Sequence, residues 1–173
     1  MAVVQVRSAQ LGDGAGCAEV WHDAGEFFAE LNPDRARVPA GTGLVAWFDA
    51  ACAAADGAEE QLFLVATLDD QVTGLLLGRL HKPTSSAPFQ LDRDLGRLRV
   101  QVTALAVTKK YRRTGAGTAL MEAAQKWALS RGAETIFLET EVNNDLSVPF
   151  SRDRMGFEAR QVVFRKDLRS GER

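Results

Sequence analysis

The sequence predicts a single α+β domain in which helices flank one mixed sheet. Its 173 residues match the length of one domain, because domains run to about 100–200 residues. Hydrophobic residues make up 46% of the chain and charged residues 25%, enough to build a core without disulfides or metals. Strand-like and helix-like segments follow in the order β-α-α-β-β-β-α-β-α-β. We therefore expect one domain over residues 1–173, with its core at about 3–168.

The first third of the chain predicts one strand and two helices. Residues 3–9 alternate weakly between apolar and polar and predict a short strand. Asp13 is expected to cap a helix from about Gly14 to Leu31, in which apolar side chains recur every three or four residues. Residues 32–41 are rich in turn-forming types and predict a loop, and residues 43–55 predict a second helix, dense in alanine.

The middle of the chain predicts a hairpin and a central strand. Residues 61–68 and 72–80 are strand-like, and Asp69-Asp70 between them predicts a tight turn. Residues 82–92 are the most loop-like stretch, either a flap beside the substrate or a mobile turn. Residues 97–107 predict a strand that becomes covered on both faces towards its end. Four of its side chains are expected on one face: Leu98, Val100, Val102 and Ala104.

The last third predicts a helix, a strand, a short helix and a closing strand. The first helix is expected from about Gly115 to Ser130 and ends at Gly132, in the left-handed position usual after a helix. Its expected buried stripe consists of Leu120, Ala123, Ala124 and Trp127. Residues 135–142 predict the next strand, with a short helix in residues 143–155. Residues 159–168 predict the closing strand, followed by a tail at 170–173.

Charge and composition exclude several classes of function. A formal net charge of −2 argues against a nucleic-acid-binding protein, which usually carries a basic excess. No apolar run approaches the roughly 20 residues of a membrane span, and no leader segment begins the chain. Cys17 and Cys52 are expected to be buried, unpaired side chains in a reducing compartment. We therefore expect a cytoplasmic protein that binds neither membrane nor metal.

A basic, glycine-containing turn predicts an anion site. Residues 107–121 read VTKKYRRTGAGTALM, in which four basic side chains precede Gly115 and Gly117. The first N–H groups of a helix have no partner and carry the positive end of the helix dipole. Glycine lets an anion approach the backbone because no Cβ is in the way. A phosphate group is the expected ligand.

Two common phosphate motifs are absent. The chain has no G-x-x-x-x-G-K-[ST] string, so a Walker loop is excluded. The G-x-G-x-x-G/A fingerprint of dinucleotide-binding proteins fails at Leu120, so a mononucleotide or dinucleotide is a weaker alternative.

The same residues resemble the GNAT superfamily of N-acetyltransferases, which use acetyl-CoA. The signature Q/R-x-x-G-x-G/A of that family corresponds to Arg112–Gly117, and it follows a strand that ends in Leu105-Ala106-Val107. The order of elements from Val3 to Leu168 also matches, and Gly156-Phe157 resembles the closing motif. The resemblance implies the acyl-CoA N-acyltransferase fold, with a mostly antiparallel sheet whose fourth and fifth strands splay apart.

The resemblance also implies which residues hold acetyl-CoA. Main-chain groups of residues 105–107 would pair with the pantetheine arm, and the N–H of Val107 is also suited to the thioester oxygen. Backbone N–H groups of the turn would hold the pyrophosphate, with Lys109 and Lys110 either adding charge or forming a solvated cluster. The implied contacts are Leu105, Ala106, Val107, Arg112, Arg113, Thr114, Gly115, Ala116, Gly117, Thr118, Asn144 and Ser151.

A base is needed because a simple amine, with a pKa near 10.4, is mostly protonated at neutral pH. Glu139 and Glu141 are the candidates, since they share one face of the predicted fifth strand with Phe137. An exposed charged face of that strand is the alternative reading. His22 and His81 are weaker candidates, because a lone histidine is more often structural.

The general acid departs from the family pattern. The second motif of the family, N-x-x-A/S-x-x-F/L-Y, is matched by Asn144, Ser147 and Phe150, but Ser151 occupies the tyrosine position. The single tyrosine, Tyr111, lies in the basic turn. Three readings remain: the Ser151 hydroxyl or a water protonates the departing thiolate, Arg152 stabilises it by charge, or the protein is a non-catalytic acyl-CoA-binding regulatory module.

The expected function is transfer of an acetyl group from acetyl-CoA to a primary amine of a small molecule or peptide. The resemblance places the acceptor between the first two helices and the 82–96 loop, and it suggests a homodimer. Trp21, His22, Phe28 and Glu30 are candidate lining residues. An acidic wall of Glu26, Glu30 and Asp34 would suit a cationic amine, although surface solvation explains these carboxylates equally well.

Overall fold

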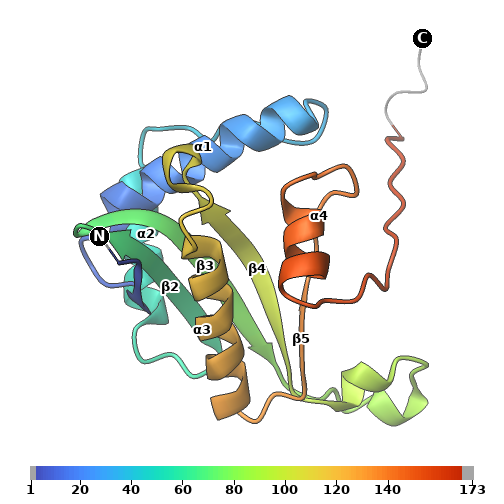
Figure 1. Ribbon diagram of the computed structural model, residues 1–173. Helices are drawn as coiled ribbons and strands as arrows, with labels where there is room; N and C mark the ends of the chain where they lie inside the picture. The colour runs from blue at the N-terminus through green and yellow to red at the C-terminus, as the bar shows by residue number, and fades with distance from the viewer. Residues whose placement is uncertain (1–2, 169–173) are drawn as a thin grey trace.

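A computed structural model describes residues 3–168 and has one five-stranded sheet in the order β1-β2-β3-β4-β5 (Figure 1). The first four strands pair antiparallel and β5 pairs parallel to β4, so the predicted mixed, mostly antiparallel sheet is confirmed. The strands are β1 Gln5–Ser8, β2 Gln61–Leu68, β3 Gln71–His81, β4 Arg99–Val107 and β5 Thr135–Leu138. The helices are α1 Gly14–Leu31, α2 Leu44–Ala55, α3 Ala116–Ser130 and the short α4 Ser147–Pro149. Residues 1–2 and 169–173, including the predicted tail, lie outside the described residues.

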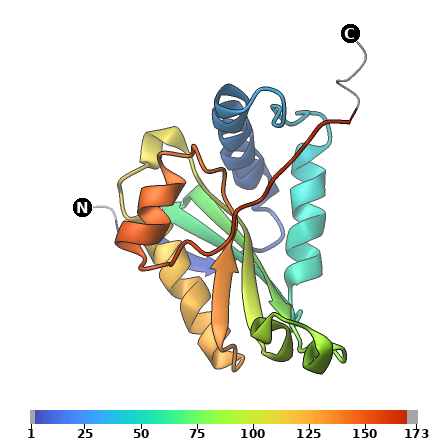
Figure 2. The same ribbon diagram turned by 90° about the vertical axis from the view of Figure 1, so that its right-hand side faces the viewer.

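Helices cover both faces of the sheet. Figure 2 shows α3 and α4 on one side and α1 and α2 on the other. Val20, Phe48 and Cys52 of the α1–α2 layer pack on Phe63, Val65 and Leu75. Leu120, Met121 and Ala124 of α3 pack on Leu64, Leu76 and Val102 from the opposite face. The sheet is thus buried on both sides, as predicted for its central strands.

The β2–β3 hairpin forms as predicted, because its turn chemistry is local. Asp69 and Asp70 have φ values of 49° and 61°, the left-handed conformation that both central residues of a type I′ turn require. Aspartate tolerates this conformation better than most residues.

A bulge in β4 corrects one prediction. The register with β3 shifts between Leu77 and Gly78, which face Ala104 and Val102, so Thr103 is the extra residue. A one-residue insertion moves all later side chains to the other face. Val102 accordingly packs on the α3 side, while Ala104 packs on the α1 side. The prediction that Ala104 shares the face of Val102 is therefore wrong.

Asp13 stands before α1, but its side chain does not cap the helix. It instead accepts two hydrogen bonds from Arg7, at 2.7 and 2.8 Å, and one from the backbone of Gln10. Burial alone would raise the pKa of Asp13, but the Arg7 guanidinium and the Gln10 amide lower it below the ordinary value. Asp49 of α2 accepts from the N–H groups of Gly12 and Gly14, so it supplies the cap that was expected of Asp13.

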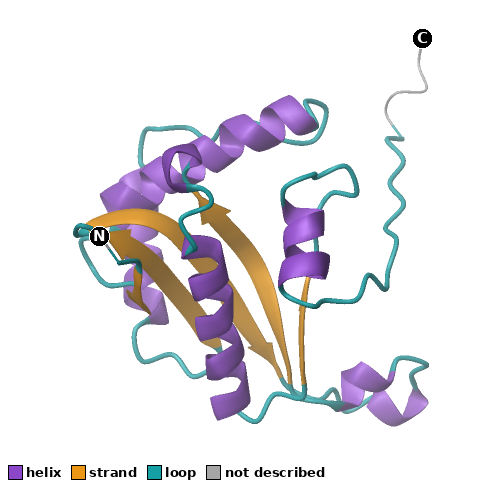
Figure 3. Ribbon diagram, in the orientation of Figure 1, coloured by secondary structure: helices purple, strands orange, loops and turns teal. Residues whose placement is uncertain are grey.

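The final part of the chain departs furthest from prediction. β5 ends at Leu138 instead of residue 142, because its pairing with β4 ends there. Residues 158–168 form no strand and have exposed side chains, so the predicted closing strand is wrong for this structure (Figure 3). The short helix predicted in residues 143–155 is present as α4, continued by a π-helical turn over Phe150–Arg154.

Both cysteines are buried and unpaired, as predicted. Burial raises the pKa of the Cys17 thiol to about 12, so this side chain stays protonated at neutral pH. In residues 3–168, none of the helices combines the length and apolarity needed to span a membrane.

Candidate functional site

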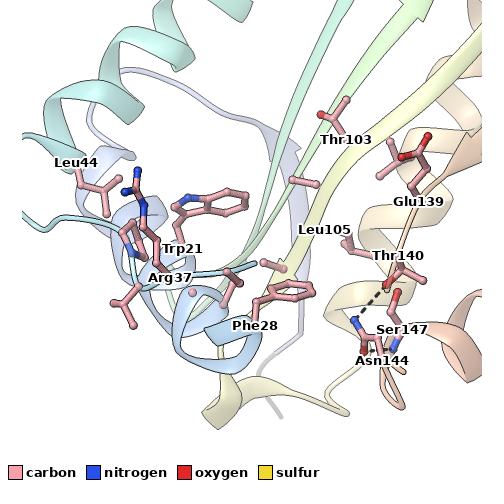
Figure 4. Close-up of a pocket in the computed structure, with 18 of the residues that line it drawn as sticks. Trp21, Phe28, Arg37, Leu44, Thr103, Leu105, Glu139, Thr140, Asn144 and Ser147 are labelled. Carbon is pink, nitrogen blue, oxygen red and sulfur yellow. Dashed lines mark hydrogen bonds between the residues drawn. The ribbon is translucent and has the colours of Figure 1, made fainter. Parts of the chain in front are cut away.

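A cavity of about 980 Å³ opens where β4 and β5 diverge (Figure 4). Residues 102–106 of β4 form its floor. One wall consists of α1, the segment over residues 36–44 and Trp47 of α2. The other wall consists of residues 138–140 and the α4 region, including Asn144 and Ser151. The volume is within the usual range for a small-molecule site.

The cavity exists because the parallel pairing of β4 and β5 stops early. The last paired residues are Val102 and Leu138, beside the bulge at Thr103. From Thr103 to Val107 β4 remains paired with β3 alone, so one edge of its backbone has no strand partner among the described residues. Unpaired main-chain groups are strong hydrogen-bonding sites for a ligand.

Gly25 allows the 36–44 segment to lie close against α1. A Cβ at this position would overlap the Cδ of Pro39 and would lie 3.3 Å from the Cα of Val38. The absence of a side chain therefore fixes the wall of the cavity opposite β5. The aromatic rings of Trp21 and Phe28, from the same helix, also line this wall.

Asn144 organises the opposite wall. Its side chain is buried, and its Oδ1 accepts from the backbone N–H groups of Leu146 and Ser147, at 3.2 and 2.9 Å. Its Nδ2 donates to the Thr140 hydroxyl at 3.1 Å. Asn144 therefore joins the end of β5 to the start of α4, and Figure 4 shows this network at the cavity.

Ser151 presents an unpaired hydroxyl at the cavity. Its residue is only 8% exposed, and its Oγ has no hydrogen-bond partner in the described structure. It lies in the π-helical turn, an irregularity that is frequent at functional sites. A buried hydroxyl without a partner is costly, which points to a ligand that completes its hydrogen bonding.

The two candidate bases have different surroundings. Both lie beyond the end of β5, so the prediction that they share a strand face with Phe137 is wrong. Glu139 lines the cavity, whereas Glu141 does not. Glu141 instead forms an ion pair with Arg35 at 2.8 Å.

Among the described residues, the Arg35–Glu141 ion pair is one of two side-chain contacts that connect the region after α1 with the loop after β5. Asn32 and Asn143 exchange side-chain hydrogen bonds of 3.4 and 3.3 Å beside it. These two pairs of residues join the C-terminal end of α1 to the loop after β5. We call them the α1–β5 clasp, and they tie the two walls of the cavity together.

The basic turn, for which the sequence predicts an anion site, lies directly before α3. Gly115 precedes the helix with φ of 92°, and Arg113 has φ of 64°, which is unusual for a residue with a side chain. Left-handed residues alternating with ordinary ones turn successive N–H groups inward, the geometry of anion-binding concavities. A Cβ on Gly117 would meet Phe150 and Val107 at 3.7–3.8 Å, ordinary van der Waals contact, whereas a Cβ on Gly115 would have nothing within 4 Å, so the backbone is open at Gly115.

Contacts with α1 position the basic turn. The backbone N–H of Lys109 donates to the carboxylate of Asp23. The Arg112 guanidinium lies 5.2 Å from the centre of the Phe27 ring, and its Nε donates to the carbonyl of Val107. The Thr114 hydroxyl donates to the carbonyl of Tyr111 at 2.7 Å, which closes the turn.

The predicted site residues divide between two places. Residues 112–118 lie at the α3 N-terminus and not in the cavity, and Val107 lies between the two. The residues that line the cavity are Leu105, Ala106, Glu139, Asn144 and Ser151. Because β4 runs from the cavity floor into the basic turn, both places belong to one continuous surface.

The predicted acceptor wall is only partly correct. Trp21 and Phe28 line the cavity, but His22 and Glu30 do not. The predicted acidic wall does not form there, because neither Glu26 nor Asp34 lines the cavity either. The 82–96 segment lies at the opposite end of β4, beside its start (Figure 1), and also stays outside the lining. Sequence reasoning missed Arg37, Leu44, Trp47 and Thr140, for which the sequence carries no motif.

The histidines and the single tyrosine lie outside the cavity lining. His22 faces Glu26 one helical turn away, at 3.7 Å. His81 hydrogen-bonds Gln101 at 3.1 Å. The Tyr111 hydroxyl donates to Gln71 at 3.2 Å, so it has a partner remote from Ser151.

Comparison with known proteins gives a family match over most of the chain. The profile described as the Acetyltransferase (GNAT) family matches residues 18–157, from within α1 to three residues beyond the π-helical turn. The chain is also similar to N-alpha-acetyltransferase 30 of Schizosaccharomyces pombe, with 42% identity over 60 residues, or 35% of this chain. It is 32% identical to the N-alpha-acetyltransferase of Sulfurisphaera tokodaii over 109 residues, or 60% of this chain. The chain spans 39% and 60% of the lengths of these two relatives.

Solved structures share the fold at low identity. The aminoglycoside N-acetyltransferase AAC(6′)-Iy, in complex with CoA, superposes with a TM-score of 0.65 at 15% identity. The match covers 97% of this chain and 97% of that one.

Proposed function

Because the chain belongs to the GNAT family of acetyltransferases and is therefore an acyltransferase, we propose that it transfers the acetyl group of acetyl-CoA to a primary amine by direct attack in a ternary complex. One observation carries this proposal: β4 forms the floor of the cavity and leads directly into the anion site at the start of α3. A donor with a phosphate-bearing end and a reactive end fits this surface, and an acceptor can enter the cavity from the α1 side.

The anion site supports acetyl-CoA as the donor. The backbone N–H groups of residues 112–118 would hold the pyrophosphate, with the glycine backbone open to it. The splayed edge of β4 at residues 105–107 would pair with the amide groups of the pantetheine arm. AAC(6′)-Iy, a protein of the same fold, is in complex with CoA, which supports a CoA thioester as the donor.

The cavity supports the transfer chemistry. The amine nitrogen forms a bond to the thioester carbonyl carbon, the carbon–sulfur bond breaks, and the sulfur leaves as a thiolate. Glu139 takes the proton that the amine must lose, directly or through a water, since it is the carboxylate that lines the cavity. The Ser151 hydroxyl, buried and without a partner among the described residues, would donate a hydrogen bond to the thiolate, which takes its proton from water.

Proximity supplies much of the rate in this scheme. Holding both reactants in one cavity converts a bimolecular step into an effectively unimolecular one, which is worth about 7–11 kcal/mol in favourable cases. Free main-chain N–H groups of the β4 edge, including that of Val107, would stabilise the oxyanion.

The names of the curated relatives favour an α-amine as the acceptor. Both are called N-alpha-acetyltransferases, whereas the structural neighbour AAC(6′)-Iy is an aminoglycoside N-acetyltransferase. An α-amine at a chain terminus has a pKa of about 7.7–8.0, lower than that of a lysine side chain. A larger fraction of it is therefore already deprotonated at neutral pH.

Initial-rate kinetics test the proposal. Thiol release from acetyl-CoA would be measured while both acetyl-CoA and an amine are varied, with mass spectrometry of the acetylated product. Direct attack in a ternary complex predicts intersecting double-reciprocal lines and no acetylated enzyme. Parallel lines with an acetyl group covalently bound to the protein would overturn direct attack. Acetyl-CoA binding without amine-dependent thiol release would indicate a non-catalytic binding module instead.

A further inference from the structure

The cavity contains two charged side chains among the described residues that line it, and their charges are opposite. Arg37 belongs to the 36–44 segment between α1 and α2, whereas Glu139 follows β5. Figure 4 shows them on opposite walls, with β4 residues between them. A ligand that spans the cavity therefore meets one cation and one anion.

The positive charge of Arg37 is available for a ligand. Within residues 3–168 Arg37 forms no hydrogen bond or ion pair, whereas its neighbour Arg35 is paired with Glu141. The contact between Gly25 and the Val38-Pro39 backbone fixes the main chain that carries Arg37. Figure 4 shows Arg37 on the α1 side of the cavity, the side that also carries Trp21. The charge is thus held on a defined wall.

Apart from Thr42, the side chains on the remainder of that wall are apolar. Trp21, Phe28 and Leu44 line it, and Trp47 leaves 55% of its surface exposed at the same cavity. Val38, next to Arg37, is 41% exposed. Exposed aromatic and aliphatic groups gathered at a cavity mark a surface that an apolar ligand covers.

We propose that the acceptor is an amino carboxylic acid with an apolar or aromatic body. Its carboxylate pairs with Arg37, because a guanidinium matches a carboxylate in charge and in planar geometry. Its body packs against Trp21 and Phe28, and its amine points to β4 and Glu139. This inference rests on the proposed function and specifies its substrate class, while the bonds formed and broken remain those of acetyl transfer.

The same charges disfavour a polycationic acceptor. An aminoglycoside carries several ammonium groups, but the cavity offers one carboxylate and adds a repelling guanidinium. The carboxylates of Glu26, Glu30 and Asp34 lie outside the cavity lining and cannot serve as direct partners there. We therefore expect aminoglycosides to be poor acceptors.

Paired acceptors test the inference. Thiol release would be measured with phenylalanine, tryptophan, leucine and methionine, each compared with its own amide, and with an aminoglycoside. We expect kcat/KM for at least one of the free acids to exceed that of its amide about tenfold or more, the size of one charge-assisted pairing. The lower amine pKa of an amide favours the opposite order, so it cannot mimic this result.

Variants assign the effect to the guanidinium. Arg37→Met keeps much of the side-chain length without the charge, and it is expected to bring acid and amide within about twofold through a higher KM for the acid. The KM for acetyl-CoA should not change. Arg93→Met is the matched control, because Arg93 lies in the 82–96 segment away from the cavity. It should preserve the preference for the acid.

Each of the other outcomes contradicts one specific claim: the carboxylate contact, the substrate class or acetyl transfer itself. Amides that equal or surpass their acids in every pair, or an acid preference that survives Arg37→Met, would overturn the carboxylate contact. Preference for an aminoglycoside or for a peptide amide would overturn the substrate class and leave acetyl transfer intact. Absence of thiol release with every amine would instead overturn the proposed function itself.

Discussion

At the residue scale, the candidate catalytic side chains differ in whether another residue already engages them. Glu139 lines the cavity, whereas Glu141 is held in the α1–β5 clasp by Arg35. Ser151 has a buried hydroxyl without a partner, whereas the hydroxyl of Tyr111 is bonded to Gln71. A catalytic group must be able to reach the reacting atoms, so we propose Glu139 for removal of the amine proton and Ser151 for a hydrogen bond to the thiolate.

The two glutamates provide a matched pair of variants. Glu139→Gln should lower kcat about 10²–10⁴-fold, the usual contribution of a positioned general base. Glu141→Gln should lower kcat less than tenfold, because it weakens one clasp contact and leaves the Asn32–Asn143 contact in place. Steady-state kinetics at saturating acetyl-CoA measure both. Equal losses, or a larger loss for Glu141→Gln, would contradict the assignment.

Asp13 makes stability depend on pH. Its pKa is lowered in the folded protein, so its contribution is present above the ordinary value of 3.8 and is lost as the pH falls through the folded-state pKa. Asp13→Asn should reduce the free energy of unfolding by about 1.5–3 kcal/mol at pH 7, because a buried charged hydrogen bond to Arg7 is lost.

Urea unfolding at several pH values checks this expectation. The difference between Asp13→Asn and the wild type should shrink below about pH 4, as the wild-type carboxyl becomes protonated. Asp34→Asn, at an exposed carboxylate, serves as the control and should change stability by less than about 0.5 kcal/mol. A difference that stays constant down to pH 2 would show that the Asp13 charge is not the cause.

At the scale of elements, the cavity depends on how closely the 36–44 segment approaches α1. Gly25→Ala would force the backbone of Val38 and Pro39 outward, because the new Cβ overlaps the Pro39 ring. We expect the KM of the amine acceptor to rise about tenfold and stability to fall by about 1–3 kcal/mol. The dissociation constant of acetyl-CoA should stay within about twofold, since the anion site lies at α3. Parallel weakening of both substrates would contradict separate walls for donor and acceptor.

Elements with local signals could be predicted from the sequence. α1 and α3 follow from three- and four-residue apolar spacing, and the β2–β3 turn follows from Asp69-Asp70. The bulge at Thr103, the early end of β5 and the missing closing strand could not be predicted, because they depend on which partner each backbone finds. The position of the wall that carries Arg37 could not be predicted either, because it depends on a tertiary contact between Gly25 and Pro39.

At the scale of the whole molecule, the proposed function gives the two layers of helices different substrates. The basic turn before α3 would hold the phosphates of the donor on one face of the sheet, and α1 with the 36–44 segment would form the acceptor wall on the other. The divergence of β4 and β5 connects the two faces. The family resemblance predicted that β4 and β5 diverge. The residues that it named for acetyl-CoA lie at the cavity between these strands or at the N-terminus of α3, with Val107 between the two. The homodimer and the cytoplasmic location stay predictions.

Exposed apolar side chains near the C-terminus are a further property of the whole molecule. Val162, Val163 and Phe164 are 76–92% exposed in a segment for which the sequence predicts a strand. β5 forms one edge of the sheet, and such an edge can accept a further strand.

Calorimetric titration of the folded protein with acetyl-CoA tests the central claim most directly, with ATP and NAD as control ligands. Micromolar binding of acetyl-CoA alone is predicted, retained in Gly117→Ala, whose Cβ makes ordinary contacts, and abolished in Gly117→Trp, whose ring would displace Phe150 and Val107 beside the basic turn. Absence of heat with acetyl-CoA, or unchanged binding in Gly117→Trp, would contradict the donor site at the start of α3.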